Sequence, residues 1–239
     1  MEKLTGENAM AIAPLMQEMA IFFSIFGMPS NADNRYLGIL KPNAHRHDII
    51  WSTLNYDCLL EIAACHAALR LNYFGEPSAS NAEACVWKLH GSCNFKIANL
   101  AAGRGVLFGQ GVIFEGGITP IQPHEVRAVF RGNTGLYPAM ALYAKGKSIS
   151  MSPGAIRDAQ ARWNQRVMSA EKVLLIGVAP NPEDSHIWDS LTKTSATVGF
   201  VGSRDMFESW TRPSSAGGKI FLGRYWSGAE KQANEFLIG

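Results

Sequence analysis

The chain has 239 residues and nearly balanced charge, with 22 Lys and Arg against 20 Asp and Glu and a net charge of +2. This length supports one domain with a substantial core. The sequence has no long run of like charge, so nucleic acid or an anionic membrane is not indicated as a partner. Charged residues make up 18% of the chain, below the roughly 25% usual for soluble domains. Two explanations stay open: a well-buried α/β core, or a homo-oligomer whose interface covers apolar surface.

Residues 1–47 are interpreted as an N-terminal helical segment. Residues 9–28 are apolar, but Pro14 and Glu18 interrupt them, and they lack the basic start of a signal peptide. Their longest clean apolar run is too short to span a bilayer. Because apolar residues recur there at helical spacing, we expect a core or interface helix and no membrane anchor.

Short apolar runs alternate with helical patterns along the rest of the chain. Runs buried on both faces are typical of parallel strands, and this alternation favours a Rossmann-like parallel sheet with helices on both faces, in one domain covering 1–239. The predicted strands are 48–53, 84–89, 147–150, 173–177 and 197–201, and the predicted helices are 58–71, 156–169 and 229–237.

Residues 94–145 depart from this alternation. They are rich in glycine and contain only short apolar pieces. A segment of this length inside a compact domain more often has a function than none. We therefore predict an inserted glycine-rich lobe of hairpins and loops lying over the site.

The four cysteines predict neither a zinc ribbon nor a disulfide scaffold, because none of them forms a Cys-x-x-Cys pair. We interpret them as buried, reduced thiols of a cytoplasmic protein, and no metal is expected. They are Cys58, Cys65, Cys85 and Cys93.

The turn 53–57 carries the first candidate site residues. It follows a predicted strand and opens a predicted helix, a position where Thr53 and Asp57 are favoured simply as caps of backbone N–H groups. The amide of Asn55 can also hold a water or a ribose hydroxyl, since it offers both a donor and an acceptor. Asp57 would then orient it.

His90 is the second candidate, at the end of the next predicted strand. Gly91 after it permits a sharp turn and close approach of a ligand. An imidazole exchanges a proton near neutral pH. The carboxyl ends of strands in an open parallel sheet bind ligands, so Asn55 and His90 are predicted to act together.

A third strand ends at Gly177, where a missing side chain permits a ligand to approach the backbone. Asn181 then begins a helix, with Pro182 at the first position and Asp184 in the first turn. Helix capping alone explains the choice of Asn181 and Asp184.

Three ordered motifs, each at the end of a predicted strand, carry a resemblance to a known family. They are Thr53-x-Asn55-Tyr56-Asp57 with Leu59-Leu60-Glu61, then Lys88-x-His90-Gly91-Ser92, then Ile176-Gly177 with Asp184-x-His186-Ile187. Together they resemble the sirtuin-like NAD-hydrolysing domains of bacterial antiviral defence, from residue 49 to the end of the chain.

The resemblance implies a Rossmann-like core that takes NAD as its substrate, without a metal, and releases nicotinamide and ADP-ribose. It implies that Asn55 positions the attack on the ribose carbon and that His90 is the general base or a ribose contact. It places Thr53, Asp57, Gly91, Gly177 and Asp184 at the bound dinucleotide. The implied partners are NAD or ADP-ribose, a second copy of the chain, and other components of a defence complex.

Two features of the family are missing from the sequence. Sirtuin deacylases carry a four-cysteine zinc module, which counts against protein deacylation here. The family's opening strand and glycine-rich loop, whose backbone receives the pyrophosphate, have no counterpart before Ile49. Three explanations stay open: a truncated member, a different mode of NAD binding, or a non-catalytic module that binds a nucleotide or a partner protein.

Overall fold

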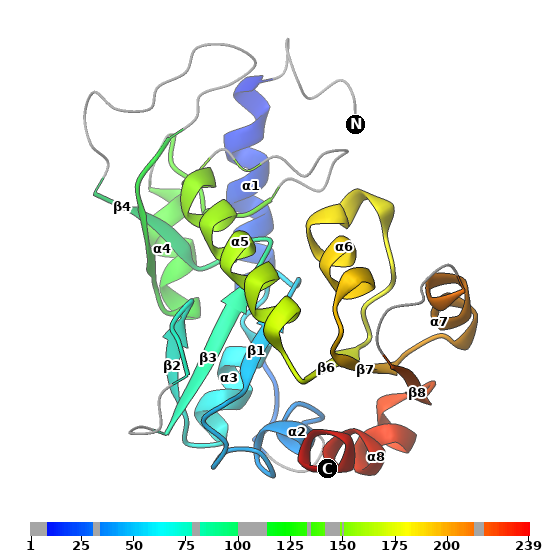
Figure 1. Ribbon diagram of the computed structural model, residues 1–239. Coiled ribbons are helices and arrows are strands. Elements are labelled where there is room, and N and C mark those ends of the chain that lie inside the picture. The colour runs from blue at the N-terminus through cyan, green and yellow to red at the C-terminus, as the bar shows by residue number, and fades with distance from the viewer. Residues whose placement is uncertain are drawn as a thin grey trace. The chain divides into compact units, whose positions relative to one another are not determined.

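A computed structural model describes residues 9–30, 34–77, 82–99, 114–132, 135–141, 149, 151–212 and 218–239 (Figure 1). The chain divides into two compact units, and each is considered by itself. The first comprises Met1–Met28 and Asp48–Ala159, and the second comprises Pro29–His47 and Gln160–Gly239. None of the described helices is long and apolar enough to cross a membrane.

The first unit is built on a parallel sheet of three strands in the order β1-β3-β2. The central strand β3 (Glu83–Lys88) is apolar along most of its length and almost entirely buried, as expected for a strand with neighbours on both sides. It lies between β1 (Ile50–Thr53) and β2 (Arg70–Tyr73). Helix α3 (Leu59–His66) connects these two outer strands.

The remainder of the first unit packs around a second small sheet. Strands β4 (Phe95–Ala98) and β5 (Gly117–Pro120) pair antiparallel, and the 3₁₀ helix η2 (Pro123–Glu125) leads into α4 (Val126–Arg131). Helix α1 (Ala9–Ser24) packs against α4. Its side chains enter two apolar clusters, one of which also contains Tyr56 of the turn after β1.

The second unit contains a parallel sheet in the order β6-β7-β8. Helix α5 (Pro153–Ser169), which begins in the first unit, precedes it, and every strand is followed by a helix. In chain order these elements are β6 (Lys172–Ile176), η3 (Pro182–Asp184), α6 (Ser185–Lys193), β7 (Thr197–Val201), α7 (Arg204–Thr211), β8 (Lys219–Gly223) and α8 (Trp226–Ile238).

Helices cover both faces of this second sheet. Successive residues of a strand point to opposite faces. Phe200 of β7 packs on Phe207 of α7, with ring centroids 5.6 Å apart, while its neighbour Gly199 faces Phe236 of α8.

Helix α2 (Leu37–Leu40) lies beside α8 at the bottom of Figure 1. The side chain of Asn234 in α8 joins them through two hydrogen bonds. It accepts from the Asn43 side chain at 2.8 Å and donates to the Gly38 carbonyl at 3.0 Å. Residues from both parts of the second unit are therefore tied together.

The mixed α/β class, the parallel pairing, and strands β1, β3, β6 and β7 agree with the sequence-based prediction. The predicted strand 147–150 lies outside the described residues apart from Ile149, which is in no strand. The described part of the predicted lobe 94–145 contains the β4–β5 pair, α4 and residues 135–141, whereas residues 100–113, 133–134 and 142–145 lie outside the described residues. The single domain and the lobe's place over a site stay predictions.

The predicted helix 58–71 is wrong at its carboxyl end. Helix α3 stops at His66, and β2 begins at Arg70. The Ala68 N–H donates to Cys65 and the Leu69 N–H to Ala64, with Ala68 in the left-handed region at φ 57°. This is a Schellman ending, which glycine usually signals. Alanine holds that position here, so the apolar pattern continues through the helix end.

Replacing Gly199 by valine is expected to destabilise the second unit. A Cβ there lies 2.8 Å from Leu222 and 3.1 Å from the Phe236 ring, so the added methyls overpack the β7–α8 contact. Such overpacking costs about 1–3 kcal/mol, read as a lower Tm in thermal unfolding. Gly228→Ala is the control, because no atom lies within 4 Å of its Cβ position in α8. A Gly199→Val protein whose Tm equals or exceeds that of the wild type contradicts the expected overpacking.

Candidate functional site

The candidate site begins with the pairing of β1 and β3. Thr53, the last residue of β1, pairs with Lys88, the last residue of β3, in a parallel register. Asn55 and His90 each follow two residues later. The two predicted catalytic residues therefore leave the same edge of one sheet at equivalent positions, as their order in the sequence predicts.

Local hydrogen bonds shape the turn that carries Asn55. The Thr53 hydroxyl accepts the Asn55 N–H at 3.1 Å, and the Asp57 carboxylate accepts the Leu59 N–H at 3.0 Å at the beginning of α3. The predicted capping role is thus confirmed for Asp57, whereas the Thr53 hydroxyl bonds within the turn. Asn55 itself is exposed, and its side-chain amide makes no hydrogen bond with the part of the chain that the structure describes.

The backbone around His90 is held on both sides. The Gly91 N–H donates to the Lys88 carbonyl at 3.0 Å, and the Ala141 N–H donates to the His90 carbonyl at 2.8 Å. Gly91 has φ 76°, and a Cβ there would lie 2.0 Å from the Ala139 carbonyl oxygen. Glycine is therefore required at residue 91 by the protein's own backbone, and ligand approach at Gly91 stays a prediction.

Further hydrogen bonds join the Asn55 turn to the His90 loop. The Leu89 N–H donates to the Thr53 carbonyl at 3.2 Å. The Tyr56 carbonyl accepts both the Cys93 N–H at 2.9 Å and the Ser92 hydroxyl at 3.2 Å. Because both segments share these bonds, they form one structural piece rather than two independent loops.

A buried ion pair lies next to the Asn55 turn and the His90 loop. Lys88 is fully buried, and its ammonium lies 3.0 Å from Glu61 of α3, whose side chain is 4% exposed. The same ammonium donates to the Asp57 main-chain carbonyl. The Tyr73 hydroxyl donates to Glu61 at 3.4 Å and accepts from Asn94 at 3.5 Å.

The pKa values of Lys88 and Tyr73 are both raised in this network. Burial alone lowers the pKa of Lys88, but the Glu61 carboxylate outweighs it and leaves that pKa above its usual value. Burial and the Glu61 charge raise the pKa of Tyr73. Both groups therefore hold their protons firmly at neutral pH, Lys88 as a cation and Tyr73 as a neutral donor.

Two of the cysteines meet at the same place. The Cys58 and Cys93 sulfurs lie 3.7 Å apart, and the hydrogen bond between them, with burial, raises the pKa of Cys58. The Cys58 thiol is therefore a poor nucleophile, because its thiolate is disfavoured. Cys85 is buried as predicted, but Cys65 is exposed, because it lies on the outer face of α3.

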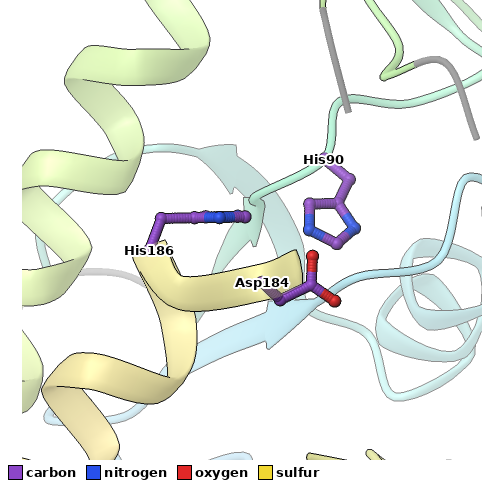
Figure 2. Close-up of side chains that lie close together, drawn as sticks. All are labelled: His90, Asp184 and His186. Atoms are coloured by element: carbon purple, nitrogen blue, oxygen red, sulfur yellow. The ribbon is translucent and has the colours of Figure 1, made fainter. Parts of the chain in front are cut away.

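The second unit holds the other predicted contacts. Gly177 follows β6 with φ 67°, and no atom lies within 4 Å of its Cβ position. Asn181 accepts the Glu183 N–H at 3.1 Å, which confirms its predicted capping role, and donates to the Asp184 carboxylate at 3.3 Å. Figure 2 shows Asp184 and His186 at the beginning of α6, and His90 at the end of the β3 loop. The expected absence of a metal stays a prediction.

Lys88 and Glu61 are the site residues that sequence reasoning missed. Both belong to the motifs of the resemblance, yet neither received a role. The available signal was a lysine inside an otherwise apolar strand. A lysine is almost never fully buried without a partner, so that pattern indicates an ion pair.

Models of known protein families give no match to this sequence, and neither do curated proteins. We therefore base the function on the geometry of the described residues and on the three motifs.

The first unit is expected to lose stability at alkaline pH. Cys58, Tyr73 and Lys88 have folded pKa values raised above their ordinary values of 9.0, 10.0 and 10.5. A raised folded pKa gives stability that is complete below the ordinary value and is lost as the pH rises above it. Urea unfolding is followed by circular dichroism. These groups should contribute a constant amount to the free energy of unfolding up to about pH 9. Above that pH, each group should lower it by up to about 1.4 kcal/mol per pH unit.

Tyr73→Phe removes one of the three groups, so its decline above pH 10 should be shallower than that of the wild type. A wild-type unfolding free energy that stays flat to pH 11 would show that these groups do not hold their protons more tightly in the fold.

Proposed function

We propose that the protein hydrolyses NAD to nicotinamide and ADP-ribose, with Asn55 and His90 as the catalytic residues. The observation that carries the proposal is their equivalent position after paired residues of two adjacent parallel strands. Ligands bind at this edge of open parallel sheets, and one residue there is an exposed amide while the other is an imidazole. The parallel strands also support a Rossmann-like core. A role in antiviral defence follows from the resemblance alone.

The reaction needs few groups from the protein. Water adds to the ribose carbon that carries nicotinamide, the bond from that carbon to the ring nitrogen breaks, and its electron pair neutralises the pyridinium. One proton is released from the water. The Asn55 amide can accept from the attacking water and donate to a ribose hydroxyl, and the His90 imidazole can take the proton.

The other predicted contacts have supporting parts in this proposal. Thr53 and Asp57 shape the turn that presents Asn55, and Gly91 lets the His90 loop pass close to Ala139. The resemblance alone implies the contacts of Gly177 and Asp184 with NAD. In the second unit, Gly177 has an open Cβ position after β6, and the Asp184 carboxylate accepts a hydrogen bond from Asn181.

Asn55→Ala and His90→Ala should each lower the rate of nicotinamide release from NAD, because each removes a group that acts on the reacting atoms. General acid–base groups contribute about 10²–10⁴-fold to such rates. Purified full-length variants are compared with the wild type by chromatography of the products. His66→Ala is the control for the loss of an imidazole, although His66 is exposed at the end of α3 and His90 is buried; thermal unfolding of His90→Ala therefore accompanies the turnover measurement.

Equal turnover in the wild type and both site variants would overturn the assignment. Loss of turnover in His66→Ala as well would indicate a general effect on the fold and would not support a role for His90.

A non-catalytic binding module is the second candidate, and one observation favours it. Apolar side chains are exposed where α1 ends: Phe22 is 55% exposed and Ile25 is 71% exposed, and the Phe22 and Phe26 rings stack edge to face at 5.1 Å. Exposed apolar patches of this kind mark protein-binding surfaces. A scaffold would use this end of α1 and leave the sheet edge empty.

Calorimetry separates the two candidates. Titrating NAD into Asn55→Ala, which should bind but not consume it, is expected to give a saturable heat, and ADP-ribose should bind the wild type. A scaffold should give no heat with either nucleotide. The control is Phe22→Ser, which changes the exposed end of α1 and should leave nucleotide binding unaltered if the sheet edge is the site.

A further inference from the structure

We propose that Lys88 is a positioning residue for Asn55, an inference that rests on the NAD-hydrolase function. Lys88 does not lie at the exposed edge and cannot touch the substrate, since its side chain is fully buried. It acts through the backbone: its ammonium donates to the carbonyl of Asp57, the residue that closes the Asn55 turn.

Stability alone does not account for a charge at residue 88. Val86 and Ala84 precede it on the same face of β3, and both are fully buried apolar residues. A buried ion pair is often no more stabilising than apolar side chains of similar volume. An apolar residue would therefore suit the strand, but it could not donate a hydrogen bond to the turn.

The bond to Asp57 completes a pair of anchors around Asn55. Two residues before Asn55, the Thr53 carbonyl accepts the Leu89 N–H; two residues after it, the Asp57 carbonyl accepts the Lys88 ammonium. Both donors come from the end of β3, directly before His90. Lys88 and Leu89 thus fix the position of the Asn55 turn relative to the His90 loop.

Glu61 and Tyr73 hold the ammonium in this position. Glu61 from α3 balances its charge, and Tyr73 from β2 donates to Glu61. A lysine stem is flexible, and these contacts restrict it to one direction. We infer that loss of the Lys88 anchor lets the Asn55 turn move without unfolding the sheet, which lowers the rate of the chemical step more than it weakens binding.

The test uses a double variant, Lys88→Met with Glu61→Gln, so that no unpaired charge is left in the interior. The matched control is Arg70→Met with Glu83→Gln, which removes an exposed ion pair between β2 and β3 in the same sheet. NAD turnover is measured for both, together with hydrogen exchange of the amides of residues 54–59, with the amides of β7 as the internal reference.

The site variant should lose about 10- to 100-fold in kcat with KM changed less than about twofold, because misplaced catalytic groups chiefly slow the reaction. Its turn amides should exchange about tenfold faster than in the wild type, since their anchor is gone. The matched control should match the wild type in both measurements.

A site variant that behaves like the matched control overturns the inference, and so does one in which KM rises while kcat is kept. If the wild type does not hydrolyse NAD, the proposed function fails, and hydrogen exchange alone then decides the positioning role. If the site variant does not fold, hydrogen exchange of the wild type decides the question: turn amides that exchange far faster than those of β3 overturn the inference, and joint protection supports it.

Discussion

Lys88 brings a positive charge into the interior of the first unit, and the geometry of the candidate site depends on how that charge is satisfied. Its two partners are Glu61 on α3 and the carbonyl of Asp57 in the turn. A charge in a low-dielectric interior is costly unless it is paired and hydrogen-bonded. The sheet, the helix that crosses over it and the turn between them are therefore held in one arrangement.

Three of the motif residues have structural roles of their own. The Thr53 hydroxyl accepts a hydrogen bond within the turn, Asp57 caps the start of α3, and Gly91 permits a close backbone contact. These roles are compatible with the proposed NAD hydrolysis, because a catalytic amide would need a rigid turn. Asn55 differs from them: it is exposed, and the described part of the chain gives its amide no partner.

The sequence located elements better than it located their ends. Strand β7 was predicted with the bounds that it has, because its apolar run is compact and β-branched. Strand β2 was missed, since alanine takes the left-handed position that ends α3 and the apolar pattern runs on. Strand β8 was missed as well. It is an edge strand, and its apolar run is only the three residues Ile220-Phe221-Leu222, bounded by Lys219 and Gly223.

The sequence by itself determined that Asn55 and His90 each follow a strand, and that the strands are parallel, because apolar runs and cap residues are local signals. It overestimated the burial of β1, which has no fully buried residue, whereas β3 is almost entirely buried. Only the tertiary structure decided that those strands are neighbours, in a register that pairs Thr53 with Lys88. It also decided that Lys88 meets Glu61, a residue far from it in the chain, through the packing of α3 on β3. Pairing between distant residues depends on how elements pack, and no local pattern encodes it.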